Sequence, residues 1–159
     1  MRLIGIVLAA TLSVGSIQLS QAQEVSVSKA DPASESWNEI TQVLLQQQEA
    51  WNRHDLDAFM SGYMKSKDLT FFSGANERQG WQETMDRYRA TYTSPGHEMG
   101  KLEFTDLRIE VLANDAAFVR GAWHLTMSDG KKPHGLFTLI FRRFPDGWKI
   151  VHDHTSAAE

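Results

Sequence analysis

The sequence predicts an α+β domain, because helical patterns fill the first half of its apolar part and strand patterns fill the second. Apolar residues recur at helical spacing over residues 37–63 and 81–92, and from residue 101 the period changes to two. Turn residues at 114–115, 128–130 and 145–147 divide this second part into four long strands. Long strands joined by tight turns are typical of an antiparallel meander.

Capping signals place the helices. Ser36 followed by Glu39 fits a capping box, so we expect the first helix to begin at Ser36. Asp55 can cap a short second helix, and a third helix is expected to begin near Gly80. The apolar stretch at 68–74 predicts a short strand between the second and third helices.

The strands of the meander are predicted at residues 102–112, 116–127, 134–144 and 148–155. Side chains alternate between the two faces of a sheet. One face is then wholly apolar, with Trp123, Leu125, Phe137, Leu139 and Phe141, whereas the other mixes apolar residues with arginine and histidine. In the last strand Trp148, Ile150, His152 and His154 share a face.

Neither face shows the clean polar alternation of a solvated sheet surface. We therefore expect helices to cover one face and a second copy of the chain to cover the other. The wholly apolar face bearing Trp123, Leu125, Phe137 and Leu139 is the predicted homodimer surface. The alternative is a monomer whose exposed face is somewhat apolar.

The N-terminal 22 residues read as a secretory signal peptide. Arg2 precedes an uncharged apolar run from Leu3 to Ile17, and Ser20-Gln21-Ala22 offers a cleavage pattern. The run has 15 residues, short of the ~20 that span a bilayer, so an uncleaved anchor is the weaker alternative. We expect a secreted or periplasmic protein with a linker at 23–36, one domain at 37–156 and a tail at 157–159.

Composition excludes several classes of function. The chain has no cysteine, which rules out disulfides, thiolate metal sites and thiol catalysis. Without Arg2 the chain has 16 − 1 = 15 basic and 20 acidic side chains, a net charge of −5 with histidine neutral. Because no block of basic residues exists, neither nucleic acid nor, after signal cleavage, a membrane is an expected partner.

Four segments together resemble the nuclear transport factor 2-like superfamily. They are "AWNRHDLDAF" (50–59), "NERQGWQETMDRY" (76–88), "NDAAFVRGAWHLT" (114–126) and "DGWKIVHDHTS" (146–156). The closer resemblance is to its SnoaL-like branch, which is similar to the association domain of calcium/calmodulin-dependent kinase II. It implies a cone-shaped, curved antiparallel sheet wrapped around N-terminal helices, the cystatin-like roll, with a pocket at its open end. Members of the superfamily include isomerases, dehydratases, cyclases, transport factors and assembly hubs, so the fold does not select a function.

The resemblance can be tested position by position. Ketosteroid isomerase resembles the chain around "HDLDAF" and "LTFFSG". At the position that matches its catalytic Asp, however, this chain has Ser73, and close to the position that matches its oxyanion Tyr it has Gln47. A serine is no proton-abstracting base near neutral pH, which disfavours that chemistry. Scytalone dehydratase-like enzymes use histidines on sheet strands with tyrosines nearby. The resemblance implies such a role for His124 and His134, with Tyr63 and Tyr88 approaching from the helices.

His124 and Arg120, which lie on the same strand, also suggest anion binding. In the association-domain branch the position matching His124 looks like a pocket arginine that can hold a small carboxylate. A histidine there would make binding depend on pH, and Arg120 on the same face could supply a permanent positive charge.

His152 and His154 project the same way, about 6.5–7 Å apart by the rise of a strand. That separation is wide for one metal ion, no cysteine or acidic cluster supports a site, and the resembled family generally carries no metal. We therefore expect no metal and no cofactor. We expect His152 in the cavity wall near His124 or His134, with His154 more exposed, although hydrogen-bonded core or interface histidines remain an alternative.

Three functions compete. The favoured one is an exported module that binds a small organic molecule in the cone. The second is a dehydratase- or cyclase-like lyase or an isomerase with His124 and His134 as acid and base. The third is a homo-oligomeric scaffold. The expected ligand-binding residues are Gln47, Trp51, Tyr63, Trp81, Tyr88, Arg120, His124, His134 and His152.

Overall fold

The computed structural model of this chain describes residues 32–158. The expected signal peptide at 1–22, and residues 23–31 of the expected linker, lie outside the described residues. Helix α1 spans Pro32–Asn52, so residues 32–36 are helical rather than linker and the expected start at Ser36 is wrong. Proline is tolerated in a first turn, and Glu35 there suits the positive end of the helix dipole.

The other two predicted helices are confirmed. Helix α2 spans Leu56–Met60, and the Oδ1 atom of Asp55 accepts a hydrogen bond from the backbone N of Ala58 at 2.9 Å. Helix α3 spans Trp81–Tyr88 and follows Gly80. It continues directly into a π-helical turn, η1, at Arg89–Thr93, which sequence periodicity did not predict.

The strands of residues 32–158 form one six-stranded sheet in the order β2-β1-β6-β5-β4-β3. Their bounds are Thr70–Ser73 (β1), Asn76–Gln79 (β2), Lys101–Ala113 (β3), Ala116–Thr126 (β4), His134–Phe144 (β5) and Gly147–Thr155 (β6). The antiparallel meander of β3 to β6 is confirmed. Strand β1 joins β6 in parallel, and β2, which was not predicted, pairs with β1.

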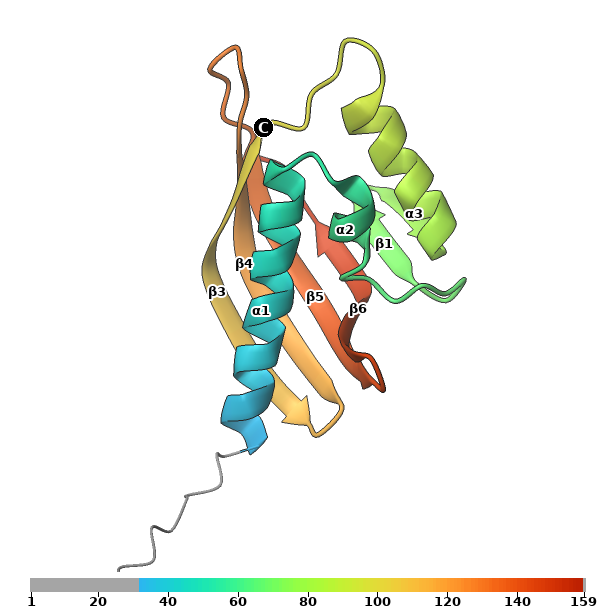
Figure 1. Cartoon of the computed structure of the whole chain (residues 1–159), viewed down its shortest axis with the longest axis vertical. Helices are drawn as coiled ribbons and strands as arrows, with labels where there is room; N and C mark the ends of the chain where they lie inside the picture. Colours follow the sequence, from blue (N-terminus) through green and yellow to red (C-terminus); the bar gives the residue numbers. More distant parts are fainter. Residues whose placement is uncertain (1–31, 159) are drawn as a thin grey trace, which may run out of the picture.

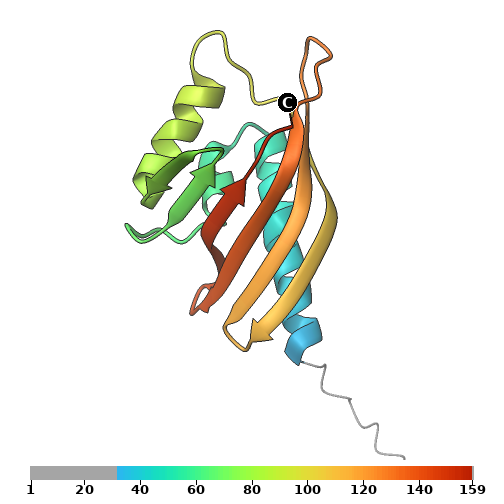
Figure 2. The same cartoon turned by 180° about the vertical axis from the view of Figure 1, so that it is seen from behind.

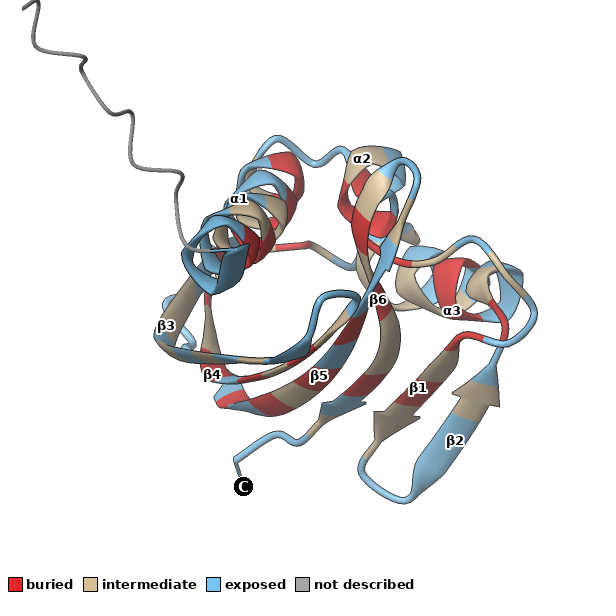
Figure 3. Cartoon of the chain, turned by 90° about the horizontal axis from the view of Figure 1, so that it is seen from below, coloured by how far each residue is buried: buried red, intermediate tan, exposed pale blue. Residues whose placement is uncertain are grey.

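The sheet curves around the helices, as expected for the predicted α+β cone. Helix α1 lies across the concave face (Figure 1). Seen from below, the three helices form a row over the sheet, and much of the buried colouring lies between the two layers (Figure 3). Within residues 32–158, no helix lies on the opposite face of β3 to β6 (Figure 2). Among residues 32–158, no helix is both long and apolar enough to cross a membrane.

Side-chain amides attach the C-terminal half of α1 to the edge strand β3. Asn52 accepts from the backbone N of Leu102 at 2.7 Å and donates to its carbonyl oxygen at 2.9 Å. Gln48 accepts from the backbone N of Phe104 at 2.7 Å. These contacts satisfy backbone groups that an edge strand would otherwise leave unpaired.

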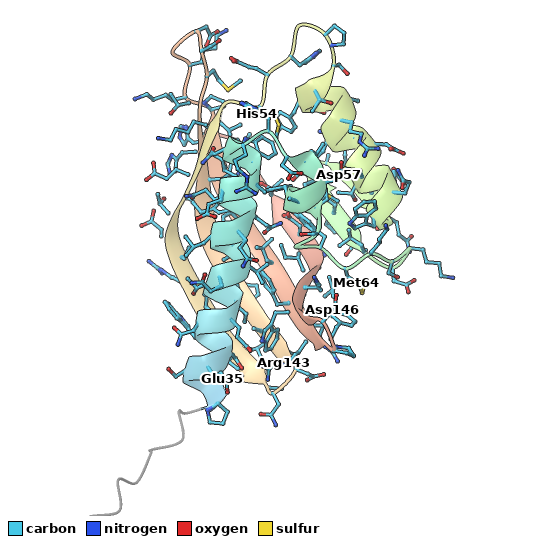
Figure 4. All side chains as sticks on the ribbon, viewed as in Figure 1. Glu35, His54, Asp57, Met64, Arg143 and Asp146 are labelled. Carbon is cyan, nitrogen blue, oxygen red and sulfur yellow. The ribbon has the colours of Figure 1, made fainter. Side chains whose placement is uncertain are left out.

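The N-terminal half of α1 is attached at the other end of the sheet. Glu39 forms an ion pair with Arg143 of β5 and accepts a hydrogen bond from the Nε1 atom of Trp148 at 2.9 Å. Figure 4 labels Arg143 at the base of α1, close to Glu35. Helix α1 is thus held at both ends, which fixes the width of the space beneath it.

The predicted homodimer surface is wrong in its choice of face. Leu125, Phe137 and Leu139 are only 4–6% exposed because they face the helices of their own chain. The exposed apolar side chains of the sheet lie on the other face, where Leu136 is 66% and Ile140 is 40% exposed. The homodimer itself stays a prediction, and we now expect it to use this outer face.

Replacing Leu136 with Asp tests the outer face as a self-association surface. We expect light scattering to report twice the monomer mass for the wild type and the monomer mass for Leu136→Asp, since an unpaired charge is costly in an apolar interface. Leu45→Asp is the matched control, because Leu45 is 41% exposed on α1 and away from the sheet. A wild type that is monomeric at high micromolar concentration would contradict the prediction.

Candidate functional site

A cavity of about 210 Å³ lies between the helices and the concave face of the sheet. Aromatic and aliphatic side chains from every layer line most of it, among them Trp51, Phe59, Phe104, Leu125 and Phe137. Its volume is below the about 300–1,000 Å³ typical of pockets for drug-sized ligands, so it suits a smaller molecule. Asp153 and Arg87 are the charged residues among the lining residues.

A β-bulge in β6 turns Asp153 into this cavity. Ile150 pairs with Phe141 and His152 pairs with Ile140, so the intervening Val151 has no partner on β5. One extra residue reverses the alternation of side chains along a strand. Asp153 therefore faces inward, where it is 5% exposed.

Among the described residues, the Asp153 carboxyl group has only one hydrogen-bond partner. The hydroxyl of Tyr63 donates to its Oδ2 atom at 2.8 Å. The Oδ1 atom is buried and finds no partner among the described residues. Burial raises the pKa of Asp153 to about 7, against the lowering effect of the Tyr63 hydrogen bond.

Backbone pairing places Tyr63 beside Asp153. Residue 63 forms an isolated parallel bridge with Ile150, supported by hydrogen bonds from Met64 N to Ile150 O and from Ile150 N to Gly62 O, both 2.9 Å. Burial, and next the charge of Asp153, raise the pKa of Tyr63 well above its usual value. Tyr63 therefore stays a hydrogen-bond donor at physiological pH.

Tyr88 joins the same site from the end of α3. Its ring centroid lies 5.4 Å from that of Phe59, 5.7 Å from that of Phe71 and 5.7 Å from that of Tyr92. Burial, and next the charge of Asp153, raise its pKa well above its usual value. The π-helical turn η1 follows directly, and such turns are frequent at functional sites.

Gln47 is a fixed polar group in the cavity wall. It is 2% exposed, and its Nε2 atom donates to the carbonyl oxygen of Phe59 at 3.0 Å. It packs so closely on Gly62 that a Cβ atom there would lie 2.6 Å from its Cδ atom. Gln47, Trp51, Tyr63 and Tyr88 all line the cavity, as expected from the sequence.

His124 and His134 do not line the cavity, and the expectation that they do is wrong. They pair across β4 and β5 on the outer face, where their rings stack with centroids 5.8 Å apart. His124 also shares a hydrogen bond with Thr105 at 3.1 Å. The error arises because the helices cover the wholly apolar face of the strands and leave the mixed face outside.

Three more expected site residues lie away from the cavity. The bulge turns His152 outward, where its Nδ1 atom and the Thr70 hydroxyl are 2.6 Å apart. Burial, and next the charge of His154, lower the pKa of His152. Arg120 forms an exposed ion pair with Glu110.

Trp81 also lies outside this cavity, where its Nε1 atom donates to the carbonyl oxygen of Met60 at 3.0 Å. As expected, His154 is exposed. His152 and His154 flank the ring of Phe72, with centroids 5.0 and 5.8 Å from it. Within residues 32–158, no three His, Asp or Glu side chains gather in a way that would hold a metal ion.

Sequence reasoning missed Asp153 and Arg87 as cavity residues. The only signal for Asp153 was a carboxyl group in the apolar strand "WKIVHDHTS", on the face opposite to the one that alternation assigned to the cavity. The C-terminal end was also missed, because Ser156, the last residue of the expected domain, and Ala157 of the expected tail line the cavity. Trp123 donates from Nε1 to the carbonyl oxygen of Ser156 at 3.1 Å and so holds this end of the chain there.

Comparisons with known proteins agree with this architecture. The family model of the SnoaL-like domain matches residues 40–159. An NTF-2-like protein of unknown function from Shewanella oneidensis is similar at 40% identity, with a TM-score of 0.71 over 76% of this chain and 98% of that one. No curated protein matches the chain.

Two more distant structures share the fold. One is a candidate calcium/calmodulin-dependent protein kinase type II association domain from Thiobacillus denitrificans, at 20% identity and a TM-score of 0.63 over 75% of this chain and 94% of that one. The other is a candidate dehydratase of the NTF2-like family from Streptomyces avermitilis, at 19% identity and a TM-score of 0.64 over 79% of this chain and 98% of that one.

Replacing Asp153 with Asn should flatten the pH dependence of stability. The pKa of Asp153 is raised from 3.8 to about 7 on folding, so its contribution to stability is complete below pH 3.8 and is lost as the pH rises through 7. Between pH 5 and 8 we expect the wild type to lose about 2–3 kcal/mol of unfolding free energy from this group.

Urea denaturation at the two pH values measures the effect. Asp153→Asn should lack this loss, whereas Asp146→Asn, at an exposed turn, should keep it. The raised pKa would be contradicted if the unfolding free energy of the wild type changed between pH 5 and 8 by no more than that of Asp153→Asn.

Proposed function

The chain belongs to the SnoaL-like domain family, and we propose that its cavity binds a small, mostly apolar organic molecule through Asp153. The observation that carries this proposal is the Asp153 carboxyl group, which is buried in the wall of an apolar cavity with one oxygen unpartnered among the described residues. Buried polar groups in native proteins nearly always have a partner. A ligand oxygen or nitrogen would supply the missing one.

The protonation state of Asp153 decides which ligand groups fit. Below pH 7 the carboxyl group is mostly neutral, because burial raises its pKa to about 7. A neutral carboxyl group can donate its proton to a carbonyl or hydroxyl oxygen, whereas a carboxylate only accepts. The proposed ligand therefore has a compact hydrocarbon body and a hydrogen-bonding oxygen.

Binding of 1-indanone, a compact bicyclic ketone, tests the proposal. We expect calorimetry to show roughly tenfold weaker binding at pH 8 than at pH 6, because ionised Asp153 cannot donate to the ketone. Asp153→Asn, which keeps an N–H donor, should remove this pH dependence. His124→Ala is the outer-face control and should behave as the wild type. Absence of binding to the wild type, or pH dependence that persists in Asp153→Asn, would contradict the proposal.

A second candidate function is acid–base catalysis of the isomerase or dehydratase kind, with Asp153 in the role first given to His124 and His134. The observation that favours it is a carboxyl group whose pKa of about 7 is matched to proton transfer near neutral pH. Tyr63 donates to the same carboxyl group. The candidate dehydratase from Streptomyces avermitilis has the same fold, which supports the possibility by analogy alone.

Hydrogen–deuterium exchange of 1-indanone in D₂O tests the catalytic candidate. Ionised Asp153 would take a proton from the carbon next to the carbonyl, the electron pair would move to the carbonyl oxygen, and a deuteron from solvent would return to carbon. NMR should then show an exchange rate that rises as the pH passes 7, opposite in direction to ketone affinity. Asp153→Asn should fall to the rate without protein, and His134→Ala should not. Equal rates with wild type and Asp153→Asn would exclude this candidate.

We also propose that the protein acts outside the cytoplasm, in the periplasm or as a secreted protein. The support is the charge, apolar run and cleavage pattern of residues 1–22. Neither the binding proposal nor the catalytic one calls for a cofactor, since Asp153 and the tyrosines supply the proton donors and acceptors.

A further inference from the structure

Arg87 is a cation among the cavity-lining residues that has no acidic partner in the described part of the chain. It is half-buried on α3 and lines the cavity. The neighbouring arginines are paired, since Arg89 lies 3.2 Å from Asp57 and Arg78 lies 3.3 Å from Glu83. Among residues 32–158 no carboxylate lies within ion-pair distance of Arg87.

The charge of Arg87 reaches the polar groups of the cavity. Burial raises the pKa of Tyr88 and of Tyr92, and Arg87 acts against that rise in both. Thr91, one helical turn after Arg87, also lines the cavity, so the two side chains belong to the same part of its wall. An anion in the cavity near this part of the wall would meet both groups.

We propose that Arg87 binds the carboxylate of an organic acid whose hydrocarbon body fills the cavity. The inference rests on the proposed ligand-binding function and narrows its ligand to a class, the compact monocarboxylic acids. A guanidinium can bind both oxygens of a carboxylate, and such charge-assisted pairs are about twice as strong as neutral hydrogen bonds.

The charges of the cavity explain why one carboxylate suits it better than two. With Asp153 neutral, the lining carries the single positive charge of Arg87, which one carboxylate neutralises. A second carboxylate would lie against apolar wall without a counter-charge, which is costly. An amine would place a cation near Arg87 and so would be repelled.

Three ligands with the same body test the inference: indane-2-carboxylate, indane-2-carboxamide and 2-aminoindane. At pH 6 we expect calorimetry to show that the wild type binds the carboxylate about 10- to 100-fold more tightly than the carboxamide, and the amine more weakly than both. Arg87→Gln should bring the ratio of carboxylate to carboxamide affinity close to one. Arg87→Lys should keep part of it, because lysine retains the charge without the fork.

Arg89→Gln is the matched control, since Arg89 is exposed, paired with Asp57 and absent from the cavity wall. It should keep the wild-type ratio. Equal affinity of the wild type for carboxylate and carboxamide, or an unchanged ratio in both Arg87 variants, would overturn the inference. If 1-indanone still binds with Asp153-dependent pH sensitivity in that case, the proposed function stands without it. If the wild type binds neither 1-indanone nor any indane ligand, both are overturned.

Discussion

The unpaired residue Val151 in β6 determines what chemistry the cavity holds. If Val151 were paired and no bulge were present, strict alternation would place Ile150, His152 and His154 on the inner face. Asp153 would then lie on the outer face. The bulge coincides with a change of neighbour on the other side of β6. Before it, Tyr63 bridges to Ile150, and after it the pairing with β1 begins at His152. The distortion thus lies where one partner ends and the next begins, and it brings Tyr63 and Asp153 within hydrogen-bond distance.

The buried carboxyl group is the costly element of this arrangement. Leu139 and Phe71 are its register partners on the neighbouring strands, and its Oδ1 atom has no hydrogen-bond partner among residues 32–158. A protein selected only for stability would place an apolar residue at such a position, since an unpartnered polar atom costs about 1–3 kcal/mol. A buried acid with a perturbed pKa in a cavity wall therefore points to function more strongly than the surrounding aromatic cluster does. The aromatic residues are consistent with ordinary core packing, whereas the acid is not.

The sequence predicted the elements of this fold better than the site within it. Helical periodicity and the Asp55 cap located the helices, so their cavity-facing residues Gln47, Trp51 and Tyr88 were placed correctly. Strand β2 was not predicted because its four residues carry no apolar pattern and are largely exposed. The cavity residues of the sheet were predicted wrongly for two physical reasons. Alternation shows which residues share a face but not which face the helices cover, and the bulge in β6 has no glycine or proline to announce it.

The shape of the cavity and its charged groups depend on different elements. Helix α1, fixed to β3 through Asn52 and to β5 through Glu39, sets the shape of the cavity without contributing a charge to its wall. The acid comes from β6 and the cation from α3, two elements whose ends meet the cavity independently. Changes at Asp153 or Arg87 can therefore alter the chemistry of the cavity while the contacts that shape it persist.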